Sequence, residues 1–291
     1  MTTESKPVIQ WLKETSGCLK GKTETPLSDS RVILADHLGK DTAWLAAHPD
    51  FLLPPHVLLG LDQKRERLAN GEPLPYILGW WEFFGLRFKV TPAVLIPRPE
   101  TELLVEMALA WLDEHPSVRE IWDIGTGSGC IPLALLSQKT DLHAHAVDIS
   151  PAALEVAGAN AQTLGLSSRM VLHRSDLLSS IAEQPVQLLC ANLPYIPSAD
   201  VAKLDVSRYE PLVSLDGGED GMRFIHELLK QVSPRLVKPY CLLLEIEYRQ
   251  ADAVMKIARE IFPMAEVNVL RDLSGQSRVV CVEGDDDDTH L

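Results

Sequence analysis

Four residues that follow an apolar run, Asn192-Leu193-Pro194-Tyr195, have the types and spacing to hold a planar nitrogen group. The run before them, residues 186–191, suits a buried strand, and open α/β sheets bind ligands beyond the carboxyl ends of their strands. There the side-chain carbonyl of Asn192 and the backbone carbonyl of Leu193 could each accept one hydrogen of an NH2 group. Tyr195 could stack on the flat group, and Pro194 would stiffen the turn. Taken alone, the tetrapeptide fits a simple strand-ending β-turn better.

A glycine turn follows another apolar run, in the sequence IWDIGTGSGC. Gly125, Gly127 and Gly129 would let the backbone approach a ligand closely where the next helix begins. Dinucleotide-binding proteins use GxGxxG, whereas the spacing here is GxGxG followed by Cys130. A carboxylate at Asp123 would repel a pyrophosphate but could receive an ammonium group. S-adenosyl-L-methionine carries an ammonium, a carboxylate and a sulfonium but no phosphate, so the turn favours this cofactor.

Two further acids end the next two predicted strands. Asp148 lies about 20 residues beyond the glycines, where a carboxylate can bind both hydroxyls of a ribose. Capping of the next helix is the alternative role, and it fits Ser150 better because Pro151 suits the first helical position. Asp176 could accept a hydrogen bond from the adenine amino group, or it could be an ordinary cap or loop carboxylate.

Together these features predict methyl transfer to a nitrogen atom. An amide or exocyclic amine nitrogen is a poor nucleophile because its lone pair is delocalised. Two acceptors would hold its hydrogens, turn the lone pair toward the sulfonium methyl and stabilise the charge that grows on nitrogen. We expect direct transfer without a strong general base, with S-adenosyl-L-homocysteine as the product. The methylated nitrogen would then lose its proton to water or to a backbone acceptor.

Composition narrows the choice of partners. The chain has 291 residues and a formal net charge of −14, with no evident basic face for nucleic acid, so a basic protein partner is expected instead. No stretch approaches the roughly 18 apolar residues of a membrane span, and the first residues do not resemble a secretory signal, which predicts a cytoplasmic protein without membrane contact. Five scattered cysteines without metal-like spacing favour reduced core residues and no bound metal. The acidic residues 284–291 are expected to be a disordered tail.

The first part of the chain, residues 1–75, reads as a small all-helical domain that holds no catalytic cluster and would serve packing or substrate recognition. Its helices are expected to begin near Ser28, near Asp41 or Thr42, and near Pro55. Residues 76–100 are aromatic and β-rich, which predicts a β-hairpin linker. The aromatic residues of this linker fit a hydrophobic core or, alternatively, a wall of the substrate cleft; they are Trp80, Trp81, Phe83 and Phe84.

Residues 101–283 alternate helices with strands and end in two strands that could pair antiparallel. This alternation predicts an α/β, Rossmann-like, doubly wound sheet. Strands are expected at residues 120–124, 143–148, 170–173, 186–191, 241–246, 265–270 and 278–283. Helices are expected at residues 101–112, 130–137, 152–164, 221–232 and 250–261.

Over nearly its whole length the chain resembles the PrmC/HemK family of release-factor glutamine methyltransferases. The stretch IPRPETE, residues 96–102, is the most specific to that family. The resemblance implies a class I S-adenosylmethionine-dependent methyltransferase domain, and an N-terminal domain that recognises a peptide chain release factor. It also implies N5-methylation of the glutamine in the Gly-Gly-Gln tip of that factor. The other matching stretches are GEPLPYILGWWEFFGLRFKV, DIGTGSG, VDISPAALEVAGANA, NLPYIP, YEPLVSLDGGEDG and RDLSGQSRVV.

The resemblance also implies site residues. Two positions depart from the family pattern. Leu193 replaces a proline of the usual Asn-Pro-Pro-Tyr, which keeps the carbonyl acceptor but not a ring-locked φ. Leu177 replaces an aromatic residue beside adenine, which keeps apolar contact but not stacking. The implied cofactor residues are Gly125, Thr126, Gly127, Ser128, Gly129, Asp148 and Asn192, and the target glutamine should meet residues 192–195.

Three other functions remain open from the sequence. A ribosomal-protein glutamine N5-methyltransferase would use the same chemistry and differ in the N-terminal module. A DNA adenine N6-methyltransferase would use the same tetrapeptide, but it needs a basic groove and a means of flipping the base. A non-catalytic binding protein could keep the fold without the activity, although the retained Asp123, Asp148, Asn192 and Tyr195 argue against it.

Overall fold

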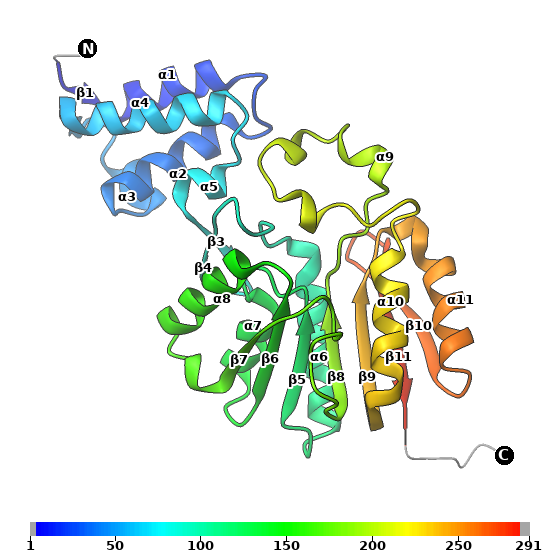
Figure 1. Cartoon of the computed structure of the whole chain (residues 1–291). Helices are drawn as coiled ribbons and strands as arrows, with labels where there is room; N and C mark the ends of the chain where they lie inside the picture. The colour runs from blue at the N-terminus through cyan, green and yellow to red at the C-terminus, as the bar shows by residue number, and fades with distance from the viewer. Residues whose placement is uncertain (1–3, 286–291) are drawn as a thin grey trace. The chain divides into compact units, whose positions relative to one another are not determined.

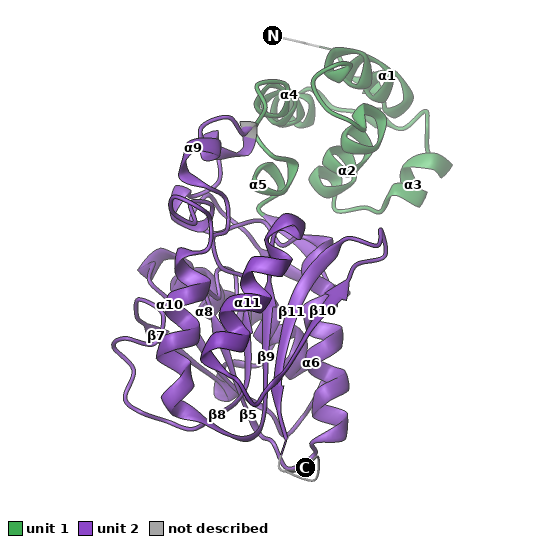
Figure 2. Cartoon of the chain, turned by 90° about the vertical axis from the view of Figure 1, so that its right-hand side faces the viewer, with its two compact units in different colours: residues 1–79 green, residues 80–291 purple. Residues whose placement is uncertain are grey.

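The computed structural model describes residues 4–285, so most of the predicted acidic tail, from residue 286 onward, lies outside the described residues. The chain forms two compact units, one up to Gly79 and one from Trp80 onward (Figure 2). The division falls four residues beyond the predicted boundary at residue 75. Among the described residues, no helix has the length and apolar character needed to cross a bilayer.

The N-terminal unit is built from helices around a small apolar core. Leu58, Leu61 and Leu68 lie on the buried stripe of its longest helix, as helical spacing predicts. Two short strands, β1 (Lys6–Pro7) and β2 (Leu52–Leu53), pair antiparallel. The helices are α1 (Val8–Leu19), α2 (Pro26–Leu38), α3 (Thr42–Ala47), α4 (Pro55–Ala69) and α5 (Leu74–Leu78).

Two predicted boundaries in this region are wrong, and prolines explain both. Helix α2 begins at Pro26 and not near Ser28, because a proline at the first helical position has its φ already fixed for a helix. Residues 76–78 belong to helix α5 and not to the hairpin, because Pro75 lies in the first turn of this helix and Gly79 ends it in the left-handed region. The start of α3 is confirmed: the Asp41 side chain accepts a hydrogen bond from the backbone N–H of Trp44.

The second unit contains a seven-stranded sheet in the order β10-β11-β9-β8-β5-β6-β7 (Figure 1). Five strands run parallel, and β11 pairs antiparallel with both β9 and β10, which confirms the predicted terminal hairpin. The chain moves outward from β5 to β6 and β7, then returns to place β8 on the other side of β5. The strands are β5 (Glu120–Ile124), β6 (His143–Asp148), β7 (Met170–Arg174), β8 (Val186–Ala191), β9 (Leu236–Glu245), β10 (Glu266–Arg271) and β11 (Ser277–Gly284).

Helices cover both faces of this sheet, so its central strands are buried on both sides and read as apolar runs. Helices α6 (Glu102–Glu114), α7 (Cys130–Gln138) and α8 (Pro151–Thr163) contribute to one core. Helices α10 (Arg223–Val232) and α11 (Ala251–Ile261) contribute to the core of the opposite face (Figure 2). This is the predicted Rossmann-like arrangement. Four cysteines are buried and free as predicted, whereas Cys18 is exposed.

The hairpin of β3 (Trp80–Phe83) and β4 (Leu86–Lys89) packs on the sheet unit through Phe83 and Phe88. Asn160 on α8 fixes it there. Its Oδ1 accepts from the backbone N–H of Lys89 at 2.7 Å, and its Nδ2 donates to the carbonyls of Lys89 and Ser128 at 3.1 and 2.8 Å. One buried amide therefore ties the hairpin to the loop that precedes α7.

We expect Asn160→Ala to destabilise the protein by roughly 2–4 kcal/mol, because it leaves the buried carbonyl of Ser128 and the partly buried N–H of Lys89 without their partner. Urea unfolding of this variant measures the loss. Asn268→Ala is the matched control, since Asn268 is exposed on β10, and it should stay within about 0.5 kcal/mol of wild type. Equal stability of the two variants would contradict the role given to Asn160.

Candidate functional site

A solvent-open pocket with an empty volume of about 1020 Å³ lies at the carboxyl ends of β5, β6 and β8. This is where the strand order reverses, the position at which open α/β sheets bind ligands. The structure thus brings together two segments that the sequence keeps far apart, the glycine turn and the tetrapeptide. The predicted residues in its wall are Gly125, Thr126, Gly127, Ser128, Asp148, Asp176, Leu177, Asn192, Leu193 and Pro194.

Gly125 allows the two segments to touch. Its φ is 79°, and a Cβ at this position would lie 3.0 Å from Cδ2 of Leu193 and 3.4 Å from the carbonyl oxygen of Asn192. Leu193 itself is buried and packs in the core of the α10 and α11 face. That packing restrains the loop at the position where the resemblance expects a proline.

Asp123 lies behind the glycine turn, fully enclosed. Within the described residues neither of its carboxylate oxygens has a hydrogen bond of normal geometry, and the hydroxyls of Thr126 and Ser128 are also buried without partners. Burial raises the pKa of Asp123 to about 7, while the nearby hydroxyl of Thr126 favours the charged form and Asp148 opposes it. Such an unpaired acid is costly for a folded protein, and it is suited to receive a cationic ligand group.

Asp148 ends β6 with its carboxylate held by backbone groups. Its Oδ2 accepts from the N–H of Gly127 and its Oδ1 from the N–H of Ser150, both at 2.9 Å. The pKa of Asp148 is raised because burial outweighs these bonds. Each oxygen keeps a further lone pair for a ligand hydroxyl. The cap of α8 is Ser150, as predicted, since its side chain accepts from the N–H of Ala153.

Asp176 and Leu177 line the next part of the wall. Leu177 has a φ of 50°, which is uncommon for a residue other than glycine. Its side chain is buried in the core beside Leu178 and Ile181. The apolar contact that the sequence predicts at this position is therefore present, and Leu177 provides it from a left-handed backbone conformation.

Asn192 occupies the edge of the pocket with its amide already oriented. Its Nδ2 donates to Oγ1 of Thr101 at 3.1 Å, which leaves the side-chain carbonyl available to a ligand. Thr101 and Glu245 are both buried at this place. Burial raises the pKa of Glu245 to about 7, and hydrogen bonding from Thr101 lowers it in part.

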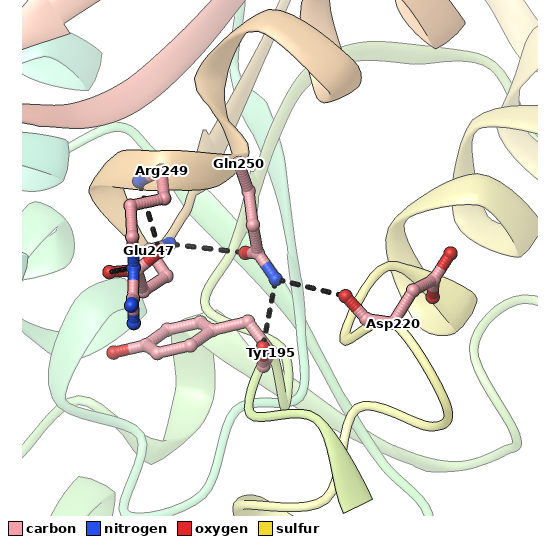
Figure 3. A network of polar contacts seen from close by, with 5 residues as sticks. All are labelled: Tyr195, Asp220, Glu247, Arg249 and Gln250. Carbon is pink, nitrogen blue, oxygen red and sulfur yellow. Dashed lines mark hydrogen bonds and ion pairs between the residues drawn. The ribbon is translucent and has the colours of Figure 1, made fainter. Parts of the chain in front are cut away.

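The backbone after Asn192 is held by Gln250, the last residue of the short 3-10 helix η6 (Tyr248–Gln250) that precedes α11 (Figure 3). Nε2 of Gln250 donates to the carbonyl of Tyr195 at 2.9 Å and lies 3.5 Å from the carbonyl oxygen of Asp220. Gly221 passes so close that a Cβ there would lie 2.2 Å from the Tyr195 carbonyl oxygen. Tyr195 itself is absent from the pocket wall, so its predicted stacking role stays a prediction.

An ion pair joins the segment before α6 to the segment that follows the tetrapeptide. Nη2 of Arg98 donates to both carboxylate oxygens of Glu210, at 2.7 and 2.6 Å. The Glu210 side chain is fully buried, whereas Arg98 is partly exposed in the pocket wall. This pair holds the stretch that contributes Pro211 and Val213 to the pocket.

The residues that line the pocket could be predicted from the sequence, but the residues that hold its loops in place could not. Asp123 and Gly129 support the turn from outside the wall, where Gly129 packs against Ala157 and Leu133. The expected hydrophobic core is confirmed for Phe83, and the alternative, a wall of the substrate cleft, is not seen in this pocket, because no residue of the aromatic cluster lines it. The supporting residues that the sequence did not single out are Arg98, Thr101, Glu210, Glu245 and Gln250. The first three had a signal, because Arg98 and Thr101 lie in IPRPETE and Glu210 lies in YEPLVSLDGGEDG.

Comparisons with known proteins agree with this architecture. A family described as the PrmC N-terminal domain matches residues 10–79, and one described as the methyltransferase small domain matches residues 100–207. The catalytic domain of hMettl16 in complex with a MAT2A 3'UTR hairpin has a similar structure, with a TM-score of 0.55 and 13% identity over 82% of this chain and 86% of that one. At that identity the likeness concerns the fold alone. Fold and pocket together define a Rossmann-like methyltransferase.

Sequence relatives identify the family. The release factor glutamine methyltransferase of Moorella thermoacetica is 40% identical over 259 residues, which cover 89% of this chain and 91% of that protein. The protein of the same name from Escherichia coli K12 is 37% identical over 274 residues, or 92% of this chain and 96% of that protein. The chain belongs to the release factor glutamine methyltransferase family.

We expect Asp123→Asn to stabilise the ligand-free protein at about pH 8.5 by roughly 1–3 kcal/mol, because a shift of one pKa unit corresponds to about 1.4 kcal/mol. The folded pKa of about 7 lies above the usual value of 3.8, so the cost of the charge is full above pH 7 and shrinks as the pH falls toward the unfolded value. Urea unfolding at about pH 8.5 and at about pH 5.5 measures this difference. A variant that is less stable than wild type at the higher pH would overturn the assignment of Asp123 as an uncompensated charge.

We expect Gly221→Ala to lower the rate of methyl transfer at least about tenfold, because the new Cβ displaces the Tyr195 carbonyl and with it the tetrapeptide. Gly275→Ala is the matched control: Gly275 has a φ of 78° against 76° for Gly221, but nothing lies within 4 Å of its Cβ position. Both variants carry the same backbone strain, of about 1 kcal/mol. Steady-state kinetics should therefore show a loss for the first variant only; equal activity would mean that the close approach at Gly221 is without consequence.

Proposed function

We propose that the protein transfers a methyl group from S-adenosyl-L-methionine to the side-chain nitrogen, N5, of the glutamine in the Gly-Gly-Gln tip of a peptide chain release factor. The observation that carries the proposal is the meeting of the glycine turn and Asn192 in one pocket. The names of the relatives, which match nearly the whole chain, support the same substrate class.

The residues of the pocket fit this cofactor. The hydroxyls of Thr126 and Ser128, which line the pocket, would accept from the ammonium of the methionine part, and the unpaired carboxylate of Asp123 behind them would attract its positive charge. Asp148 would hold the ribose hydroxyls with its remaining lone pairs, and Asp176 and Leu177 would lie against the adenine. When bound, the cofactor supplies a methyl group on a positively charged sulfur.

The chain's own residues then orient the substrate amide. Asn192 presents its side-chain carbonyl because its NH2 group is engaged by Thr101. Together with the carbonyl of Leu193 it would accept both hydrogens of the glutamine amide, fix the nitrogen in one orientation and stabilise the positive charge that develops there. Pro194 in the wall and the Gln250 brace on Tyr195 keep these acceptors in place.

The N-terminal unit would supply recognition of the protein partner. Its surface exposes large apolar side chains, and Ile9 and Leu52 are both more than half exposed. They lie on neighbouring segments, because the backbone N–H of Ile9 bonds to the carbonyl of Pro49 and Pro7 pairs with Leu52. Exposed apolar groups of this kind suit a protein surface, whereas the charge of −14 disfavours direct nucleic acid binding.

The direct test is to incubate the protein and S-adenosyl-L-methionine with a purified release factor and examine the Gly-Gly-Gln peptide by mass spectrometry. We expect the mass of one methyl group on the glutamine. Asn192→Ala should reduce turnover by roughly 100-fold or more while the dissociation constant of the cofactor changes only about threefold, because the amide acceptor is lost but the cofactor contacts remain.

Two other substrates serve as controls in the same assay. A ribosomal protein that is methylated while the release factor is not would replace the proposal by the related glutamine methyltransferase activity. Methylation of adenine in DNA would replace it by the base-modifying activity. Normal turnover by Asn192→Ala would show that the amide acceptor has been assigned to the wrong residue.

A further inference from the structure

Glu245 is a buried acid that neither the proposed cofactor site nor the substrate site uses. It is the last residue of β9 and is 1% exposed. Ala191 on β8 pairs with Leu244 on β9, so the next residues along these parallel strands, Asn192 and Glu245, end the sheet side by side. Among the described residues, Oε2 of Glu245 has no hydrogen-bond partner.

Thr101 connects this acid to the pocket. Its Oγ1 accepts a hydrogen bond from Nδ2 of Asn192 at 3.1 Å, so its own hydroxyl hydrogen is free to go elsewhere. Hydrogen bonding from the side chain of Thr101, and less strongly from that of Asn192, lowers the pKa of Glu245 against the effect of burial. An ionised carboxylate can only accept, so it takes the hydroxyl hydrogen of Thr101 and leaves the Thr101 oxygen to accept from Asn192. The direction of every bond in the relay then follows from the charge on Glu245.

We propose that Glu245 is a positioning residue which, through Thr101, decides which end of the Asn192 amide faces the substrate. This inference rests on the proposed function, because it concerns which end of the Asn192 side-chain amide meets the NH2 group of the substrate glutamine. With Glu245 ionised, the carbonyl of Asn192 faces the pocket and accepts. With Glu245 protonated, its O–H donates to Thr101, whose hydroxyl then donates to the Asn192 carbonyl. The amide turns over and presents donors to a substrate group that is itself a donor.

Burial, together with the charges around Glu245, places the titration of this carboxyl near neutral pH. Burial raises its pKa to about 7, Arg278 on β11 favours the ionised form, and Glu100 opposes it. The phenol of Tyr195 and the thiol of Cys130 also feel the charge of Glu245, but burial raises both of their pKa values to about 12, so neither titrates in this range. Methyl transfer should therefore be fast above pH 7 and fall as the pH drops through the pKa of Glu245.

Glu245→Gln tests the relay, since glutamine keeps the shape and its NH2 group donates to Thr101 as the protonated acid would. With saturating cofactor, which removes the separate titration of Asp123, we expect kcat to fall roughly 10–100-fold with KM for the release factor within about threefold. The decline below neutral pH should disappear. The ligand-free variant should be at least as stable as wild type, because it lacks a buried charge.

A second pair of variants keeps the test decisive if Glu245→Gln does not fold. Thr101→Val removes the hydroxyl and should lower kcat as Glu245→Gln does. Thr101→Ser retains the hydroxyl and should keep a kcat close to that of wild type. Glu283→Gln is the matched control: Glu283 is a half-buried acid on β11 whose pKa is also raised by burial, but it does not line the pocket. This control should keep both the wild-type rate and the wild-type pH profile.

Nuclear magnetic resonance separates this inference from the proposed function. The side-chain amide signal of Asn192, identified by its absence in Asn192→Ala, should shift with the titration of Glu245 in wild type and stay constant in Glu245→Gln. If that coupling is seen but release factor is not methylated, the proposed function fails and the relay stands. If the amide signal does not follow Glu245, or if an active enzyme keeps its rate and pH profile in Glu245→Gln, the relay is overturned.

Discussion

The site depends on one constraint, which is that the parallel strands β5, β8 and β9 end together at one edge of a buried sheet. Each strand delivers a polar side chain at this edge: Asp123 near the end of β5, Asn192 just after β8 and Glu245 at the end of β9. Helices enclose both faces of the sheet and exclude water from this edge. Asp123 and Glu245 are therefore buried acids with carboxylate oxygens that lack a hydrogen-bond partner. The surrounding core must be stable enough to tolerate them, as is usual for functional sites.

Each loop at this edge is held by a partner from a distant part of the chain. Gln250 holds the carbonyl of Tyr195, Arg98 holds Glu210, and Asn160 holds the carbonyl of Ser128 in the glycine turn. These bonds act on backbone groups or on a buried charge, so they restrain the loops where they touch the pocket. A rigid arrangement lowers the cost of aligning two reactants, and that cost is the main barrier when the nucleophile is a weak amide nitrogen.

Most of the sheet could be predicted from the sequence, because strands buried on both faces are apolar runs bounded by glycine, aspartate or proline. The strands at 120–124, 143–148 and 186–191 have the predicted bounds for this reason. Residues 76–78 misled the prediction, since their aromatic and β-branched side chains favour a strand whereas Pro75 and Gly79 impose a helical turn. The glycine turn and the tetrapeptide could also be found, because their chemistry is carried by neighbouring residues.

The supports of the site could not be found in this way. Thr101 and Asn192 are separated by 91 positions, and Glu245 reads as an ordinary polar end to an apolar strand. The pairing of β8 with β9 brings Asn192 beside Glu245, and the segment before α6 adds Thr101. The domain boundary and the role of the N-terminal unit in recognition stay predictions, as does stacking by Tyr195.

The enclosure of Glu210 has a consequence for the behaviour of the protein in solution. Mobile ions weaken attractions between exposed charges over a distance of about 10 Å at moderate ionic strength, but they cannot enter around a fully buried carboxylate. The ion pair between Arg98 and Glu210 should thus weaken less in concentrated electrolyte than a fully exposed pair would. Attraction between the net charge of −14 and the basic partner that the sequence predicts would have no such protection, so electrolyte would weaken that encounter more than it weakens the pocket.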